Sequence, residues 1–173
     1  MSNIKEDLGR VKAFVFDVDG VLSTCKAFLY PTGEMMRSMN IKDGYALQYA
    51  IKKGYIIGII SGGDSESVRT RFVKLGIQDI YLKSHDKKKD FADFLMKHKL
   101  TAADILYMGD DLPDFEVMQQ VGFPACPADA AEEIKSISKY ISHKAGGDGC
   151  VRDVIEQVLR LQGNWFHKDA LSW

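Results

Sequence analysis

The stretch VKAFVFDVDGVLS, residues 11–23, decides the fold. It opens with a short apolar, β-branched and aromatic run, which is typical of a strand buried on both faces of a sheet. Asp17 and Asp19 follow this run, and Gly20 turns the chain. Residues i and i+2 of a strand face the same way, so we expect both carboxylates to point into one crevice. Two close carboxylates repel each other and require a cation or a shared proton.

Strand-like and helix-like segments alternate along the rest of the chain. Further strands are expected at 55–61, 79–84, 105–108 and 123–127. Helices are expected at 43–54, 64–76, 87–100, 114–122, 130–142 and 149–163. A β-hairpin is expected at about 26–41, around the turn that contains Pro31 and Gly33. The pattern predicts one α/β domain, residues 1–173, with a Rossmann-like parallel sheet and helices on both faces.

The composition limits the possible partners. The chain has 173 residues, 46% of them hydrophobic, and a net charge of -1. No excess of positive charge favours nucleic acid or an anionic membrane, and no apolar run is long enough for a membrane span. Cys25, Cys126 and Cys150 are odd in number and lack the spacing of a metal site, so we interpret them as reduced thiols of a cytoplasmic protein.

Two motifs near other strand ends suit an anionic ligand. GIISGGD, residues 58–64, places the Ser61 hydroxyl and the Gly62 backbone N–H before a helix, where a phosphate oxygen can bind, although a plain strand-to-helix turn has the same pattern. SHDKKKD, residues 84–90, supplies Lys87, Lys88 and Lys89. One of these lysines could neutralise a phosphoryl group, while the others face solvent.

A third motif, GDDLPD at residues 109–114, supplies the carboxylates of Asp110, Asp111 and Asp114 just after an apolar strand. Turn formation explains one aspartate here but not three. Together with Asp17 and Asp19 these carboxylates suit a hard divalent cation, and Mg²⁺ fits an open site of this kind. Carboxylates, a cation, a hydroxyl and a lysine together indicate phosphoryl transfer through an aspartyl-phosphate.

The ordered set D-x-D-G-V, S-G, K and G-D-D-x-x-D resembles the haloacid dehalogenase superfamily of phosphatases. The resemblance implies that Asp17 is the nucleophile and Asp19 the general acid/base. It implies that Asp17, the backbone carbonyl of Asp19 and Asp110 hold Mg²⁺. It further implies that Asp111 and Asp114 orient the metal shell and that Ser61 and Gly62 bind the phosphoryl oxygens. Lys87 would neutralise part of the phosphoryl charge.

Larger members of this superfamily carry a cap domain over the substrate. The segments between the motifs are too short for one here, so either the substrate is large or another subunit covers the site. Residues 30–47 and 146–159 are similar to the capless 3-deoxy-D-manno-octulosonate 8-phosphate (KDO 8-phosphate) phosphatases. These enzymes are tetramers whose hairpins form a barrel and whose glycine-rich C-terminal segment can reach a neighbouring site. The resemblance makes Gly146, Gly147, Gly149 and Arg152 candidates for that contact and assigns Gly62 to the phosphoryl oxygens. It makes Arg71 and Lys74 candidates for contact with the substrate carboxylate, although both could be exposed charges of a helix, and the glycine-rich segment could be an ordinary loop before the last helix.

The resemblance therefore implies a cytoplasmic, homotetrameric, Mg²⁺-dependent phosphatase that releases KDO for lipopolysaccharide precursor synthesis. One alternative is a phosphatase of nine-carbon 2-keto sugar acid 9-phosphates, of the KDN or N-acetylneuraminate type. Some of those carry a glutamate where this chain has Gly63. A phosphatase of another phosphorylated molecule, a non-catalytic oligomerisation module and a phospho-acceptor signalling domain also fit part of the pattern. The tail, residues 164–173, is expected to be mobile or to dock on a neighbour through Trp165, Phe166 or Trp173.

Overall fold

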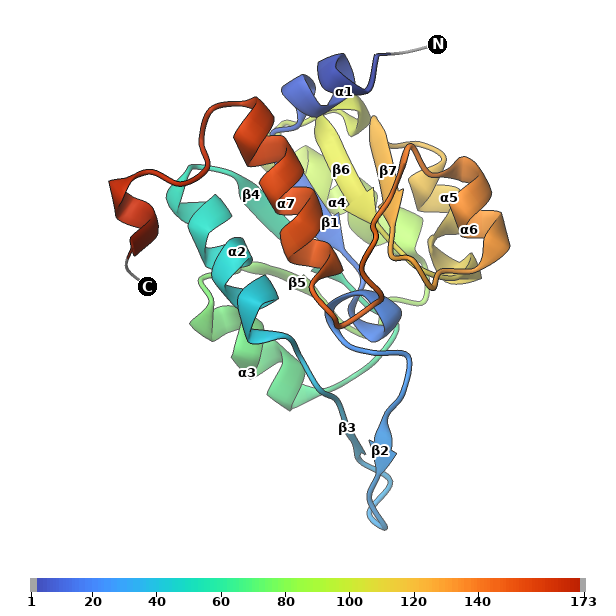
Figure 1. The fold of residues 1–173 in the computed structure, drawn as a ribbon. Coiled ribbons are helices and arrows are strands. Elements are labelled where there is room, and N and C mark those ends of the chain that lie inside the picture. Colours follow the sequence, from blue (N-terminus) through green and yellow to red (C-terminus); the bar gives the residue numbers. More distant parts are fainter. Residues whose placement is uncertain (1–2, 172–173) are drawn as a thin grey trace.

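A parallel sheet of six strands forms the centre of the molecule (Figure 1). The computed structural model describes residues 3–171. The strand order is β5–β4–β1–β6–β7–β8, and every neighbouring pair is parallel. The strands are β1 (Ala13–Phe16), β4 (Ile56–Ile60), β5 (Asp79–Tyr81), β6 (Ile105–Met108), β7 (Phe123–Cys126) and β8 (Tyr140–Ile141). The predicted α/β class with a parallel sheet is confirmed.

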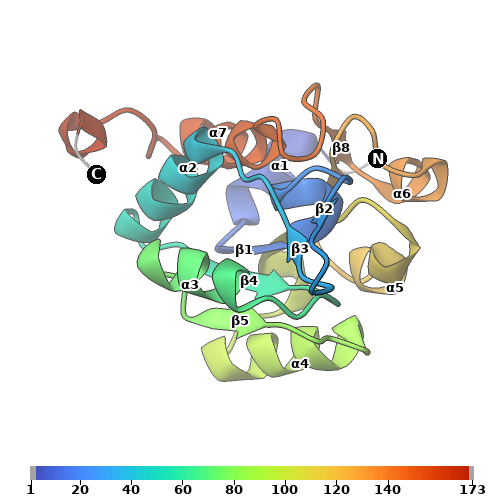
Figure 2. The same cartoon turned by 90° about the horizontal axis from the view of Figure 1, so that it is seen from below.

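Helices cover both faces of this sheet, as Figure 2 shows for α2 and α7 on one side and α4 on the other. Alternate residues of β1 enter two separate cores, with Phe14 and Phe16 in one and Ala13 and Val15 in the other. The first core is closed by α1 (Ile4–Arg10), α2 (Ile41–Lys52), α3 (Glu66–Lys74) and α7 (Cys150–Leu161). The second is closed by α4 (Lys87–His98), α5 (Phe115–Met118) and α6 (Glu132–Ile137). Burial on both faces explains the continuous apolar runs of the strands.

A local signal explains where α4 begins, whereas two differences from expectation arise from contacts made in the folded chain. Asp86 begins α4 by accepting hydrogen bonds from the backbone N–H groups of Lys88 and Lys89. The helix expected at 130–142 ends at Ile137, because the Lys139 N–H donates to Pro124 and the chain joins the sheet edge as β8. Helix α1 was not expected from the sequence. It packs through Leu8 and begins after an Asn3 cap.

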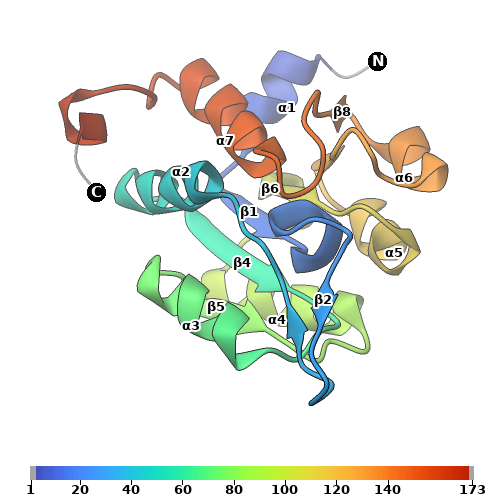
Figure 3. The same ribbon diagram turned by 60° about the horizontal axis from the view of Figure 1, so that its bottom comes forward.

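The predicted hairpin is present and lies at the end of the sheet that carries the aspartates (Figure 3). Its strands are β2 (Phe28–Leu29) and β3 (Met35–Met36), which pair antiparallel. Gly33 takes a positive φ of 85° in the connecting turn, a conformation that favours glycine. The hairpin therefore projects from the domain as an extension of the loop after β1.

The tail lies along α2 of its own chain. The Trp165 ring meets the Tyr49 ring edge-on with 5.3 Å between centroids, and Asp169 forms an ion pair of 2.7 Å with Lys53. Trp173, considered above as a docking residue, is outside the described residues. Within residues 3–171, none of the helices combines the length and the apolar character needed to cross a bilayer.

Candidate active site

The predicted site residues gather where β1, β4 and β6 end. The Asp17 N–H still donates to Met108 of β6 at 3.1 Å, and the chain then leaves the sheet. Asp19 remains extended, with φ -74° and ψ 122°, before Gly20 takes a φ of 83°. A Cβ on Gly20 would lie 1.9 Å from Oδ2 of Asp110, so only glycine lets these two loops approach. The loop after β1 is thus packed directly against the GDD loop after β6.

Three carboxylates meet in this packing. Oxygen atoms of Asp17, Asp110 and Asp114 all lie within 4.8 Å of one another. Asp114 is fully buried, and its Oδ1 accepts a hydrogen bond of 2.7 Å from the Tyr107 hydroxyl. Its Oδ2 accepts from the Asp110 N–H at 3.3 Å. Asp111 points elsewhere: it accepts from the Leu112 N–H at 2.8 Å and is exposed.

Lys87 is the lysine that reaches the carboxylates. Its Nζ lies 2.9 Å from Oδ2 of Asp17 and 2.7 Å from Oδ1 of Asp114. Burial by itself would lower the pKa of Lys87, but the two facing carboxylates outweigh it and raise that pKa. Lys88 instead pairs with Glu116 at 2.7 Å, and Lys89 is exposed. The structure thus singles out one lysine of the three.

The carboxylate cluster carries more negative charge than Lys87 offsets. Burial, and then the charge of Asp114, raises the pKa of Asp17 well above its ordinary value despite the nearby Lys87. Burial, followed by the charges of Asp114 and Asp111, raises the pKa of Asp110 to about 7. The raised pKa values of Asp17 and Asp110 reflect the repulsion within the group, which makes its three carboxylates a fitting donor set for a divalent cation with oxygen ligands.

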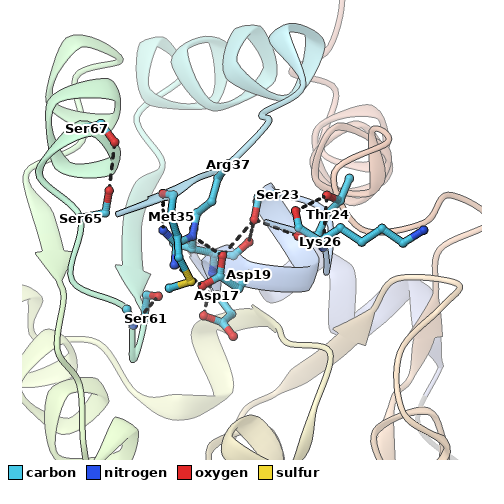
Figure 4. Close-up of polar contacts among 12 residues, drawn as sticks. Asp17, Asp19, Ser23, Thr24, Lys26, Met35, Arg37, Ser61, Ser65 and Ser67 are labelled. Carbon is cyan, nitrogen blue, oxygen red and sulfur yellow. Dashed lines mark hydrogen bonds and ion pairs between the residues drawn. The ribbon is translucent and has the colours of Figure 1, made fainter. Parts of the chain in front are cut away.

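Asp19 has different partners from Asp17 (Figure 4). Arg37, just beyond β3, donates from Nε to Oδ1 at 2.5 Å and from Nη2 to Oδ2 at 3.0 Å. The buried Ser23 hydroxyl also donates to Oδ1, at 3.1 Å. The Arg37 side chain is 6% exposed and that of Asp19 46%. The two aspartates lie at one site, as predicted, but each is held by its own cation.

The loop after β4 borders Asp19. Ser61 is buried, and its Oγ accepts a hydrogen bond of 3.2 Å from the Gly63 N–H. A Cβ on Gly63 would lie 3.5 Å from both Oδ2 of Asp19 and Oγ of Ser61, and 3.2 Å from Nη2 of Arg37. A Cβ on Gly62 would lie in ordinary van der Waals contact, 3.7 Å from the Ser84 carbonyl oxygen. The predicted phosphoryl-binding loop therefore lies beside the acid/base candidate.

The residues predicted to bind the rest of the substrate lie in two places. Arg71 of α3 lines a cavity of about 300 Å³ together with Arg37, whereas Lys74 is exposed on the same helix. Gly146 and Gly147 pack against their own chain: a Cβ on Gly146 would lie 2.0 Å from the Gly20 carbonyl oxygen, and the Gly147 N–H donates to Val21 at 2.9 Å.

The two remaining predicted residues of the C-terminal segment are occupied in a similar way. Gly149, with a φ of 103°, directly precedes α7. Arg152 pairs with Glu156 at 2.6 Å, and its guanidinium lies 5.5 Å from the centre of the Trp165 ring. The four residues of the C-terminal segment therefore have structural roles within their own chain. Contact of these residues, or of Arg71 and Lys74, with a substrate stays a prediction.

Sequence reasoning missed Arg37, Ser23 and Tyr107. Ser23 ends the stretch at 11–23, and Tyr107 supplies the one hydroxyl of an apolar strand. A polar group at a position expected to be buried could have marked both residues as part of the site. Arg37 has no such signal, because only the fold brings the end of the hairpin to Asp19.

Parallel strands that end in a buried nucleophile candidate, a lysine and a carboxylate cluster define a phosphohydrolase of the haloacid dehalogenase type. Residues 64–154 match the family model of the haloacid dehalogenase-like hydrolases. The chain is 35% identical to the 3-deoxy-D-manno-octulosonate 8-phosphate phosphatase KdsC of Salmonella typhi over 153 residues, which is 88% of this chain and 81% of that protein. It belongs to this phosphatase family within the haloacid dehalogenase-like hydrolases.

Solved structures agree with this assignment. The phosphatase of Moraxella catarrhalis, in complex with magnesium, phosphate and KDO, matches with a TM-score of 0.90 at 33% identity, over 97% of this chain and 95% of that one. The cobalt-bound phosphatase of Haemophilus influenzae matches with a TM-score of 0.90 at 26% identity, over 95% of this chain and 98% of that one.

Proposed function

We propose that the chain hydrolyses KDO 8-phosphate to KDO and phosphate with Mg²⁺, in lipopolysaccharide precursor synthesis. Its membership of the phosphatase family supports this substrate. The observation that carries the chemistry is the buried carboxylate of Asp17, held 2.9 Å from Lys87 at the edge of the Asp110–Asp114 cluster. A nucleophile that must meet an anionic substrate needs positive charge around it, which Lys87 and a cation held by the carboxylate cluster would supply together.

The cation would be held by Asp17, the backbone carbonyl of Asp19 and Asp110, with Asp114 orienting them. When bound, Mg²⁺ supplies charge that offsets the carboxylates and draws electron density from the phosphoryl group. Asp114 is fixed for its orienting task by the hydrogen bonds from Tyr107 and Lys87.

The reaction divides into two displacements at phosphorus. A carboxylate oxygen of Asp17 attacks the phosphorus and the bond to the sugar oxygen breaks, while Asp19 gives that oxygen a proton. Water then attacks the aspartyl-phosphate, Asp19 takes a proton from the water, and phosphate leaves with Asp17 restored. Ser61 and the Gly62 N–H hold phosphoryl oxygens throughout, and Lys87 neutralises part of their charge.

Assembly and location complete the proposal. Homotetramers would form through the hairpin, whose Phe28 and Leu29 side chains are 70% and 75% exposed. Location in the cytoplasm is consistent with three free cysteines, one exposed and two buried.

Phosphate release from KDO 8-phosphate, compared with release from nine-carbon 2-keto acid 9-phosphates, tests the function. We expect Mg²⁺-dependent turnover with preference for the eight-carbon substrate, and none with Asp17→Asn. A preference for a nine-carbon acid would keep the mechanism and change the substrate. Absence of turnover for all of them, with Mg²⁺ bound, would contradict the proposal.

A further inference from the structure

Arg37 connects the acid/base candidate to a second cavity. Two of its five N–H donors bind both oxygens of Asp19, and Nη1 donates to the Met35 carbonyl at 3.3 Å. The guanidinium therefore has donors left for another acceptor. Figure 4 shows the side chain reaching from the hairpin strand towards Asp19.

The cavity on the other side of Arg37 suits an organic anion. Its volume is about 300 Å³, and its lining consists of Met36, Arg37, Met39, Ser67, Val68 and Arg71. The described residues of this lining combine two guanidinium groups and a hydroxyl with apolar side chains, and none of them is a carboxylate. Paired arginines bind a carboxylate in a planar, bidentate manner. The cavity is thus fitted to a carboxylate, and Arg37 links it to Asp19.

The contact between Arg37 and Asp19 conflicts with the proposed role of Asp19. A general acid must come within hydrogen-bond distance of the leaving oxygen. Here Nε and Nη2 occupy both oxygens, and the Ser23 hydroxyl adds a third donor to Oδ1. At least part of this ion pair must open in each catalytic cycle. Another carboxylate is the group best able to replace Asp19 as the partner of the guanidinium.

We propose that Arg37 exchanges partners: it holds Asp19 when the site is empty and passes to the substrate carboxylate, which binds between Arg37 and Arg71. The inference rests on the proposed function and deepens it. Arg37 then binds the substrate carboxylate and makes Asp19 accessible only when an acidic substrate is present. Phosphate esters without a carboxylate leave the ion pair closed, so the exchange selects for sugar acids in a site that has no cap.

The test compares Arg37→Met on two esters, KDO 8-phosphate and p-nitrophenyl phosphate, which has no carboxylate. We expect kcat/KM for KDO 8-phosphate to fall by about tenfold or more, mainly through KM, because the variant loses a charged contact. For p-nitrophenyl phosphate kcat/KM should rise, because Asp19 is no longer covered. Arg37→Gln provides the same comparison with a polar side chain should the Met variant fail to fold.

Lys26→Met is the matched control, since Lys26 is a cation at the start of the same hairpin whose side chain points away from Asp19 (Figure 4). Neither ester should respond to it. Equal losses on both esters for Arg37→Met would show that Arg37 only orients Asp19, and unchanged rates would show that it does neither. Either result would overturn the exchange. A wild-type protein that hydrolyses p-nitrophenyl phosphate but not KDO 8-phosphate would instead contradict the proposed function.

Calorimetric binding provides a readout that does not depend on turnover. Free KDO carries the carboxylate but no phosphate, so Arg37→Met should weaken its binding by about tenfold or more and leave binding of inorganic phosphate unchanged. Weaker phosphate binding with unchanged KDO binding would place the guanidinium on the phosphoryl group and overturn the assignment to the carboxylate.

Discussion

Lys87 and Asp114 form an ion pair of 2.7 Å whose side chains are only 7% and 1% exposed. The same ammonium group pairs with Asp17, so one buried cation serves two buried carboxylates. Such a cluster is stable only while every member is compensated, because an unpaired buried charge is far more costly than an exposed one. The arrangement therefore ties the stability of the fold to the charge balance of the site.

Replacing Lys87 with Met should destabilise the metal-free protein by about 3–5 kcal/mol, since both carboxylates lose their partner. Added Mg²⁺ should recover part of this loss by supplying charge to the same oxygens. Phosphatase activity should nearly disappear, because no ammonium group remains beside the phosphoryl group. Denaturant unfolding with and without Mg²⁺, together with the rate of phosphate release, measures these effects.

Lys88→Met is the matched control. Lys88 pairs with Glu116 at the surface, and such pairs contribute at most about 1 kcal/mol. Similar losses of stability for the two variants would contradict the special place of Lys87.

Magnesium binding should weaken as the pH falls below neutrality. The pKa of Asp110 is raised to about 7 by burial and by the charges of Asp114 and Asp111, so in the metal-free protein this carboxyl group holds a proton below that pH. A ligand must lose its proton to bind a cation, so affinity should fall by about tenfold per pH unit for each proton displaced. Calorimetry between about pH 6 and about pH 8, in buffers of different ionisation enthalpy, measures both affinity and proton release.

Asp110→Asn is the control for this titration. It should bind Mg²⁺ more weakly at about pH 8 and show a flatter dependence on pH. If the wild-type protein bound Mg²⁺ equally well across this range without releasing protons, the raised pKa would have no part in metal binding.

The sheet could be predicted from the sequence because its strands are buried on both faces. The runs at 13–16 and 105–108 are apolar throughout, and short runs of this kind are typical of central strands in a parallel sheet. Boundaries governed by tertiary contacts could not be predicted. Helix α6 ends where Lys139 begins to pair with β7, and α1 exists because Leu8 is buried and Gln162 donates to its last carbonyls. Neither contact leaves a local pattern in the chain.

The candidate site also contains residues that the sequence could predict and residues that it could not. Asp17, Asp110 and Asp114 follow strands directly, so the rule that strand ends share an edge was enough to bring them together. The sequence left three lysines as candidates, and only the start of α4 at Asp86 turns Lys87 inward. Arg37 could not be found, because its contact with Asp19 depends on where the fold places the segment that follows the hairpin.

Gly63 should influence the choice of substrate. A Cβ at this position would lie 3.2 Å from Nη2 of Arg37, so a glutamate introduced there could pair with that guanidinium. For Gly63→Glu we expect kcat/KM to fall by about tenfold or more for KDO 8-phosphate and to fall less for nine-carbon 2-keto acid phosphates. Rates of phosphate release on both substrate classes measure the change.

Gly9→Glu is the control for this substitution, because nothing lies within 4 Å of a Cβ at Gly9 on α1. It should alter neither rate. An equal loss on the two substrate classes for Gly63→Glu would mean that the glutamate merely disturbs the loop.

The hairpin should hold the assembly together. Phe28 and Leu29 are exposed by 70% and 75% on β2, and burying such side chains between copies contributes about 1.5–3 kcal/mol for each one. The double variant Phe28→Asp, Leu29→Asp should therefore reduce the molar mass from that of the proposed tetramer towards that of one chain, as measured by light scattering during size-exclusion chromatography. Met96→Asp is the matched control, because Met96 is 74% exposed but belongs to α4 and not to the hairpin. An unchanged mass for the hairpin variant, or an equal reduction for both variants, would place the contact between chains elsewhere.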